Sequence, residues 1–286
     1  MIAAVSDIHG NLPALEAVVA DIEHLHVDQV VNLGDCLSGP LWPAETADWL
    51  IKLNWPTLAG NHERQMLSPD AASLDNGDGF AASSISAAHR DWLAGLPPVM
   101  TLGDDLFLCH GTPGGDDGYW LHRGGPGAMR KATLDEIAPY ATSHGLALCG
   151  HTHVSRCVTL DDGRMIANPG SVGLPAFDDH EPVPARMEPE PVIPQACYLI
   201  AELNAEGWRV TCGRSPTTLS VPCAVPKPTA GSVGPIRSGP ESADGSLYVY
   251  ILYLLYLLTK YIVEHISSGM PPYGSFRPGK STISIG

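Results

Sequence analysis

Short apolar runs alternate with polar segments along the first half of the chain, and five of these runs end at, or one residue before, a cluster of Asp, His, Gly or Asn. Four of the five have the length of a short buried β-strand. The runs are Ile2–Val5, Val30–Leu33, Thr57–Leu58, Leu106–Cys109 and Leu146–Cys149. After the first run, apolar residues recur at helical spacing from Leu12 to Ile22, with Pro13 tolerated in the first turn. Further helices are predicted at Ala44–Leu53 and Ser83–Leu93.

Strand-like segments dominate the chain from Leu106 onward. Beyond the runs given above, they are Val154–Leu160, Met165–Ala167, Cys197–Leu203 and Trp208–Cys212. The segments Asp161–Gly163 and Asn204–Gly207 place glycine after polar residues, which predicts hairpin turns. An alternating half followed by a strand-rich half predicts an α/β fold: two mixed β-sheets packed as a sandwich and flanked by helices.

The composition of the chain changes near residue 214. Residues 214–246 are rich in Pro, Ser and Gly and are predicted to be a linker without fixed structure. An apolar segment and a polar tail follow at 247–286, and the uncharged stretch of about 12 residues is shorter than a bilayer span. Three interpretations stay open for this region: non-native sequence from an altered reading frame, a membrane anchor at 247–263, or a packing or oligomerisation element.

The charge of the chain narrows the class of partner. The net charge is −15 with only 16 Lys and Arg among 286 residues, which argues against a nucleic-acid polymer. A small phosphorylated ligand is still compatible, because bound metal ions can dominate the local field.

The cysteines and the amino terminus both bear on the compartment. The seven cysteines form no C-x-x-C pair, which favours free thiols in a reducing compartment. Met1–Val5 leads straight into the first polar cluster, leaving no room for a signal peptide. We therefore expect a cytoplasmic protein.

Polar clusters at the ends of the five predicted strands contain residues that bind metals. The clusters are Asp7–Asn11, Gly34–Asp35, Gly60–Glu63, His110–Gly111 and Gly150–His153. Because the carboxyl ends of strands meet in one crevice of an open α/β sheet, we expect these side chains to converge. The candidate ligands are Asp7, His9, Asp35, Asn61, His110, His151 and His153. A single histidine beside a strand is more often structural, but five such clusters in one chain favour a metal site.

The mixture of imidazole, carboxylate and amide ligands suits two divalent transition-metal ions. Manganese is the first expectation, with iron, zinc, cobalt or nickel as alternatives; magnesium and calcium fit the histidines less well. Two such ions about 3.5–4 Å apart lower the pKa of bound water and neutralise phosphoryl oxygens.

The series D-x-H, G-D, G-N-H-E, H-G and G-H-T-H resembles the calcineurin-like metallophosphoesterase superfamily, and in particular its small bacterial phosphodiesterase and diadenosine-tetraphosphatase-like branch. Asn168–Gly173 is similar to that branch as well, and the resemblance covers residues 1–213. It implies a four-layer α-β-β-α fold and cleavage of phosphate esters by a metal-bound hydroxide. One ion would be held by Asp7, His9, Asp35 and His153. The second would be held by Asp35, Asn61, His110 and His151, so that Asp35 bridges the two ions.

The resemblance also implies roles for residues near the ligands. His62 is expected to act as general acid toward the leaving group, the alternative being a hydrogen-bonding role behind the ligands. Asn61 and Asn11 are candidates for contact with the phosphate, although a cap on the helix beginning at Leu12 is the favoured role of Asn11. Glu63 is expected to orient a ligand.

Several sequence features restrict the expected substrate. Gly34–Gly39 lacks the second aspartate and the arginine of the Ser/Thr protein phosphatases, which argues against that activity. Trp42, Tyr119 and Trp120 either line the crevice and stack on a nucleobase or simply cover helix ends. A small phosphodiester or nucleotide-like ester is the expected substrate. The alternatives are a phosphomonoesterase and a catalytically idle protein-binding module on the same fold, and the oligomeric state is not predicted.

Overall fold

The structure, a computed structural model, describes residues 1–73, 77–124, 128–174, 186–187 and 195–216. These residues belong to one compact unit, Met1–Pro228. Almost all of the predicted linker at 214–246, and the whole of 247–286, lie outside the described residues. No helix in the part of the chain that the structure describes is long and apolar enough to cross a membrane.

Two mixed β-sheets form the centre of this unit. The first has the strand order β12-β11-β1-β2, and the second has the order β3-β4-β7-β9-β8. The strands of the first sheet are β1 (Ile2–Val5), β2 (Gln29–Asn32), β11 (Gln195–Asn204) and β12 (Gly207–Pro216). Those of the second are β3 (Val99–Leu102), β4 (Leu106–Cys109), β7 (Leu146–Leu148), β8 (Arg156–Thr159) and β9 (Met165–Asn168). Strands β1 and β2 are parallel, as are β4, β7 and β9, so their carboxyl ends share one edge of each sheet.

The sandwich is stabilised by strands whose successive side chains point to opposite faces of the sheet. On β1, Ala4 lies in the apolar cluster between the sheets, whereas Ala3 and Val5 face the helices. On β4, Leu106 and Leu108 join the central cluster and Cys109 lies in the outer one. The same period of two applies on β7, so the central strands β1, β4 and β7 are buried on both faces.

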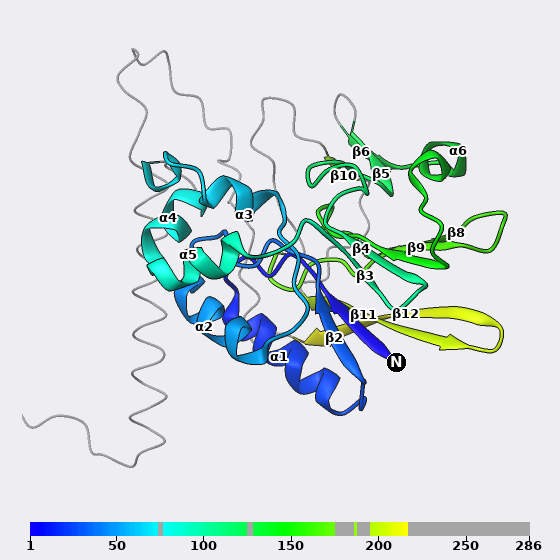
Figure 1. The fold of residues 1–286 in the computed structure, drawn as a ribbon, viewed down its shortest axis with the longest axis horizontal. Coiled ribbons are helices and arrows are strands. Elements are labelled where there is room, and N and C mark those ends of the chain that lie inside the picture. The colour runs from blue at the N-terminus through cyan, green and yellow to red at the C-terminus, as the bar shows by residue number, and fades with distance from the viewer. Residues whose placement is uncertain (74–76, 125–127, 175–185, 188–194, 217–286) are drawn as a thin grey trace, which may run out of the picture. The chain divides into compact units, whose positions relative to one another are not determined.

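Helices cover the first sheet, and a smaller layer covers the second (Figure 1). The helices are α1 (Leu12–Glu23), α2 (Pro43–Leu53), α3 (Asn61–Met66), α4 (Gly77–Ser84), α5 (Ala87–Ala94) and α6 (Leu134–Ile137), with short 3-10 turns at Ala71–Ser73 (η1) and Ala138–Tyr140 (η2). Leu15, Val18 and Leu50 pack from α1 and α2 toward β1. On the other side, α6 accompanies a small sheet of order β10-β6-β5, formed by Arg186–Met187, Ala128–Lys131 and His122–Arg123. The expected fold class is confirmed.

Several predicted elements need correction in detail. The single helix expected at Ser83–Leu93 is two helices, because the Ser86 hydroxyl accepts a hydrogen bond from the His89 amide and starts α5 anew. The strand expected at Thr57–Leu58 is only an isolated bridge between Thr57 and Asn32. Both predicted hairpins are present, joining β8 to β9 and β11 to β12.

Candidate metal centre

The predicted ligands come together at the shared edge of the two sheets. Three groups of side chains have one ligand atom from each member within 4.8 Å of the others. They are Asp7, His9 and His153; Asp35, His110 and His151; and His9, Asp35 and His62. Because β1 and β2 belong to one sheet and β4 and β7 to the other, both sheets contribute to the cluster. The structure therefore brings together six of the seven predicted metal ligands in these groups, and Asn61 adjoins them through His110.

The backbone turns sharply at five of these residues. Asp7, His9, Asp35, His151 and His153 have φ values of 56°, 50°, 55°, 68° and 59°. Such left-handed conformations are unfavourable for residues other than glycine and occur preferentially at functional sites. The backbone at Asp7 and His9 is therefore not extended. It is the left-handed turn after the strand that directs both side chains into the cluster.

Backbone carbonyls fix the orientation of three imidazole rings. Each ring donates a hydrogen bond from Nδ1, which leaves Nε2 of the neutral ring with a lone pair. The three pairs are His9 with Ser38 O at 2.7 Å, His110 with Leu33 O at 2.8 Å, and His153 with Leu174 O at 2.6 Å. Metal-binding histidines are oriented in this way, with the other ring nitrogen held by a hydrogen bond.

The free ring nitrogens point toward one another. Nε2 of His9 lies 3.2 Å from Nε2 of His153, and Nε2 of His110 lies 3.2 Å from Oδ1 of Asn61. Burial and the neighbouring His153 lower the pKa of His9 to about 4, so this ring is neutral near pH 7. The lone pair of the neutral His9 ring therefore faces a second imidazole nitrogen, an arrangement that a cation between the two rings would stabilise. The donor set thus fits a divalent transition-metal ion.

Asp35 adjoins both groups of ligands. Its Oδ2 lies 3.1 Å from Nε2 of His110 and 4.0 Å from Nε2 of His9. Burial by itself raises the pKa of Asp35, but the charge and hydrogen bond of His110 outweigh it and lower the pKa well below the usual range. The carboxylate is therefore ionised and lies between His110 on one side and His9 on the other. Conversely, burial lowers the pKa of His110, but Asp35 raises it to about 10. A bound cation would displace that imidazole proton.

Glu63 holds the loop that carries Asp35. Its buried carboxylate accepts hydrogen bonds from the amides of Asp35 at 2.8 Å, Cys36 at 2.8 Å and Gly60 at 2.7 Å. A carboxylate with three such donors is strongly fixed. Glu63 thus joins the β2 loop to the start of α3, in agreement with the orienting role expected from the sequence.

His62 lies at the edge of the cluster with a partner that was not predicted. Nδ1 of His62 lies 2.8 Å from Oδ1 of Asp78, on α4, and Nε2 lies 4.0 Å from Oδ2 of Asp35. The backbone amide of His62 also donates to Oδ1 of Asp35 at 3.0 Å. Burial lowers the pKa of His62, but the hydrogen bond to Asp78 and the charge of Asp35 raise it to about 9. The ring is therefore protonated near pH 7.

The segment Asn168–Gly173 forms hydrogen bonds with the loops that carry the candidate ligands. The hydroxyl of Ser171 donates to the carbonyl of Asp7 at 2.7 Å, and Nδ2 of Asn168 donates to the carbonyl of Gly150 at 2.6 Å. A Cβ at Gly173 would lie 1.7 Å from the Ile8 carbonyl oxygen, so only glycine fits there. The segment fixes the two loops that carry Asp7 and His151.

Asn11 is used inside the protein. Its Oδ1 accepts a hydrogen bond from the Ala14 amide at 3.2 Å, and its Nδ2 donates to the Gly173 carbonyl at 2.9 Å. The structure therefore shows Asn11 as the cap of α1 and as a support of the Gly173 loop.

The three aromatic residues considered for the crevice have different environments. Trp120 is 1% exposed and belongs to the outer apolar core, so it does not line the crevice. The Tyr119 ring is half-buried and its centroid lies 5.0 Å from that of His151. Trp42 is half-buried at the start of α2.

Comparison with known proteins relates the chain to one family. A family model described as the calcineurin-like phosphoesterase superfamily domain matches residues 1–188. An uncharacterised protein from Methanocaldococcus jannaschii is 26% identical over 197 residues, which are 61% of this chain and 77% of that protein.

Two solved structures share the fold. A metallophosphoesterase from Sphaerobacter thermophilus has a TM-score of 0.56 and 26% identity, over 76% of this chain and 88% of its own. A hypothetical protein from Pyrococcus horikoshii has a TM-score of 0.57 and 19% identity, over 75% of this chain and 88% of its own.

Proposed function

The chain belongs to the calcineurin-like phosphoesterase superfamily, and from that premise we propose that it hydrolyses small phosphodiesters or nucleotide-like esters at a centre of two divalent cations. The observation that carries the proposal is the position of Asp35, whose carboxylate adjoins His9 on one side and His110 on the other. A single carboxylate between two sets of nitrogen and oxygen donors is what a bridged pair of cations needs.

We assign the ligands as the family motifs imply. Asp7, His9, Asp35 and His153 would hold one cation, and Asp35, Asn61, His110 and His151 the other. Manganese is the cation we propose first, and iron, zinc, cobalt and nickel suit the same donors. When bound, two such cations lower the pKa of water and neutralise the phosphoryl oxygens.

His62 is proposed as the general acid. Its Nε2 faces Asp35 at the edge of the ligand cluster, while Nδ1 is bound to Asp78. With Nδ1 donating to the carboxylate, the proton on Nε2 is available for the oxygen that leaves the phosphorus. Asp78 is a positioning residue in this scheme: it fixes the ring and stabilises its protonated form.

The Asp78→Asn variant is expected to lower kcat about tenfold or more for esters with an alkoxide leaving group, because the His62 ring loses its fixed orientation and part of its charge stabilisation. KM should change little, since Asp78 lies behind the ring and away from the phosphate. Steady-state kinetics would give kcat and KM for each of two substrates, a dialkyl diester with an alkoxide leaving group and an alkyl p-nitrophenyl diester with a nitrophenolate leaving group. The matched control is Asp48→Asn, which breaks a similar pair, with His89 at 2.9 Å, on other helices. An equal loss in both variants would contradict the assignment.

The charge of the chain favours a diester. A phosphodiester carries one negative charge, whereas a phosphomonoester carries nearly two near pH 7. The nearby Arg64 is already paired with Asp116, whose Oδ1 lies 2.8 Å from Nη2. Because Arg64 is paired in this way and the protein is acidic, bound metal ions would have to neutralise the charge of the substrate. The single charge of a diester needs less neutralisation than the nearly double charge of a monoester.

Hydrolysis of bis-p-nitrophenyl phosphate, compared with p-nitrophenyl phosphate, tests the proposal. With metal-stripped protein reloaded with Mn²⁺, we expect a kcat/KM about tenfold higher or more for the diester. A preference for the monoester would favour the phosphomonoesterase alternative. Metal uptake without turnover of either ester would favour the protein-binding alternative.

The cysteines support the cytoplasm as the proposed compartment. Cys36, Cys109 and Cys149 are buried free thiols among the described residues, where they act as small apolar groups. No disulfide joins any of the cysteines that the structure describes.

A further inference from the structure

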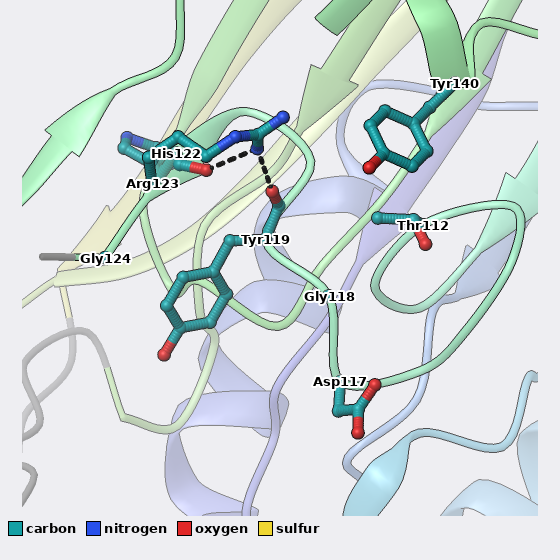
Figure 2. A pocket seen from close by; sticks show the side chains of 8 residues that line it. All are labelled: Thr112, Asp117, Gly118, Tyr119, His122, Arg123, Gly124 and Tyr140. Carbon is teal, nitrogen blue, oxygen red and sulfur yellow. Dashed lines mark hydrogen bonds between the residues drawn. The ribbon is translucent and has the colours of Figure 1, made fainter. Parts of the chain in front are cut away.

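A cavity of about 350 Å³ lies next to the metal centre, between the loop that follows β4 and the turn η2. Two aromatic side chains line it, Tyr119 and Tyr140, and they lie on different sides of the cavity (Figure 2). The Tyr119 ring also contacts His151, with centroids 5.0 Å apart. One side chain therefore joins the cavity to a proposed metal ligand.

Tyr119 is held in place by its neighbours. The next residue, Trp120, is buried in the outer core, and its indole N–H donates to the Ile137 carbonyl at 3.2 Å. Nη1 of Arg123 donates to the carbonyl of Tyr119 at 2.6 Å, as drawn in Figure 2. The backbone that carries the aromatic ring is thus fixed before any ligand binds, which lowers the entropy cost of binding.

The polar groups of the cavity fit a sugar and a base better than a second phosphate. The hydroxyl of Thr112 and the exposed carboxylate of Asp117 line the side nearer the β4 loop. A carboxylate repels phosphate but accepts hydrogen bonds from ribose hydroxyls. The guanidinium of Arg123 is engaged by the carbonyls of Tyr119, His122 and Glu136. The guanidinium carbon of Arg123 lies 5.9 Å from the centroid of the Tyr140 ring, so the face of Tyr119 is the main stacking surface that the cavity offers to a planar ring.

We propose that this cavity is a subsite for a nucleobase carried by the substrate, stacked on Tyr119 while the attached phosphate lies at the metal centre. The inference rests on the proposed function and extends it to a substrate class, nucleoside 5′-phosphate esters. Tyr119 is the specificity-determining residue, because its ring lines the cavity and also contacts His151, a proposed ligand of the cluster.

Calorimetric titration of the full chain loaded with Mn²⁺ tests the subsite, with adenosine 5′-monophosphate and ribose 5-phosphate as probes. They share the phosphate and the sugar and differ in the base. We expect the nucleotide to bind about tenfold tighter or more. In Tyr119→Ala the ratio of the two affinities should fall close to one, and in Tyr119→Phe it should stay near the wild-type value, because the stacking face is kept.

Two further variants make the result decisive. Tyr140→Ala changes a side chain that is 49% exposed, so this variant should fold even if Tyr119→Ala does not. It should lower the ratio of nucleotide to sugar-phosphate affinity several-fold. Leu203→Ala removes an exposed apolar side chain from the end of β11 and should leave the ratio unchanged. Equal affinities for the two probes in the wild-type chain, or a ratio that neither tyrosine substitution lowers, would overturn the subsite.

The titration is independent of turnover. A preference for the nucleotide in a chain that cleaves no ester would support the subsite and contradict the proposed hydrolysis. Diester cleavage with equal affinity for both probes would overturn the subsite alone.

Discussion

The Asp35→Asn variant is expected to lose about a thousandfold or more of kcat/KM on bis-p-nitrophenyl phosphate at saturating Mn²⁺, because bridging cations supply several kcal/mol of stabilisation to the transition state. The amide keeps the size of the carboxylate but not its charge, and it offers only one oxygen. In the structure both carboxylate oxygens are used: Oδ1 accepts from the His62 amide at 3.0 Å, and Oδ2 lies 3.1 Å from His110 Nε2. Steady-state kinetics would measure the loss of kcat/KM, and a parallel Mn²⁺ titration would measure the loss of metal affinity.

The control for this variant is Asp162→Asn, in the exposed turn between β8 and β9, where the carboxylate pairs only with Arg164. It should retain wild-type activity and metal affinity. If Asp35→Asn retained more than a tenth of the wild-type kcat/KM while binding Mn²⁺ normally, Asp35 would not bridge the cations.

Replacing His62 by Asn should have an effect that depends on the leaving group. A general acid contributes about 10²–10⁴-fold when the leaving oxygen is basic. We therefore expect a loss of that size on a dialkyl phosphodiester and a much smaller loss on bis-p-nitrophenyl phosphate, since nitrophenolate leaves without protonation. Nε2 lies 4.0 Å from the proposed bridging carboxylate, at the edge of the cluster where we propose that the phosphate binds. Rates for a series of leaving groups of increasing pKa would measure this dependence.

His89→Asn is the matched control, because His89 also pairs with an aspartate, Asp48, but on α5 and away from the ligand cluster. Its rates should follow those of the wild-type chain for every leaving group. Equal losses on alkyl and nitrophenyl esters in His62→Asn would instead indicate that His62 binds a cation, as its place beside His9 and Asp35 would also allow.

Much of the fold follows from local patterns in the sequence. The runs Ile2–Val5 and Leu106–Cys109 are strands with the predicted bounds, because their apolar residues are buried on both faces of a sheet. The helix α3 was not predicted, since its six residues are mostly polar and show no apolar period. Glu63 fixes the position of α3, because its carboxylate accepts hydrogen bonds from the amides of Asp35 and Cys36, which are far away in the sequence.

The clustering of the candidate ligands was predictable where one motif contains both the candidate ligand and the turn beside it. Two motifs show this by their spacing beside a strand and a glycine: Asp7 with His9, and His151 with His153. Asp78 gives no such signal, because it lies 16 residues from His62 and meets it only when α4 packs beside α3. The two roles considered for Trp120 and Tyr119 could not be separated either. Adjacent residues in an irregular segment point in different directions, and only the packing shows that Trp120 enters the core while Tyr119 meets His151.

Titration of metal-stripped full-length protein with Mn²⁺, followed by calorimetry and by electron paramagnetic resonance, tests the central claim most directly. A pair of cations bridged by Asp35 predicts two equivalents per chain, a spin-coupled signal, and a single equivalent or none in Asp35→Asn. Binding of only one equivalent to the wild-type chain, or of two equivalents without spin coupling, would contradict the dinuclear centre.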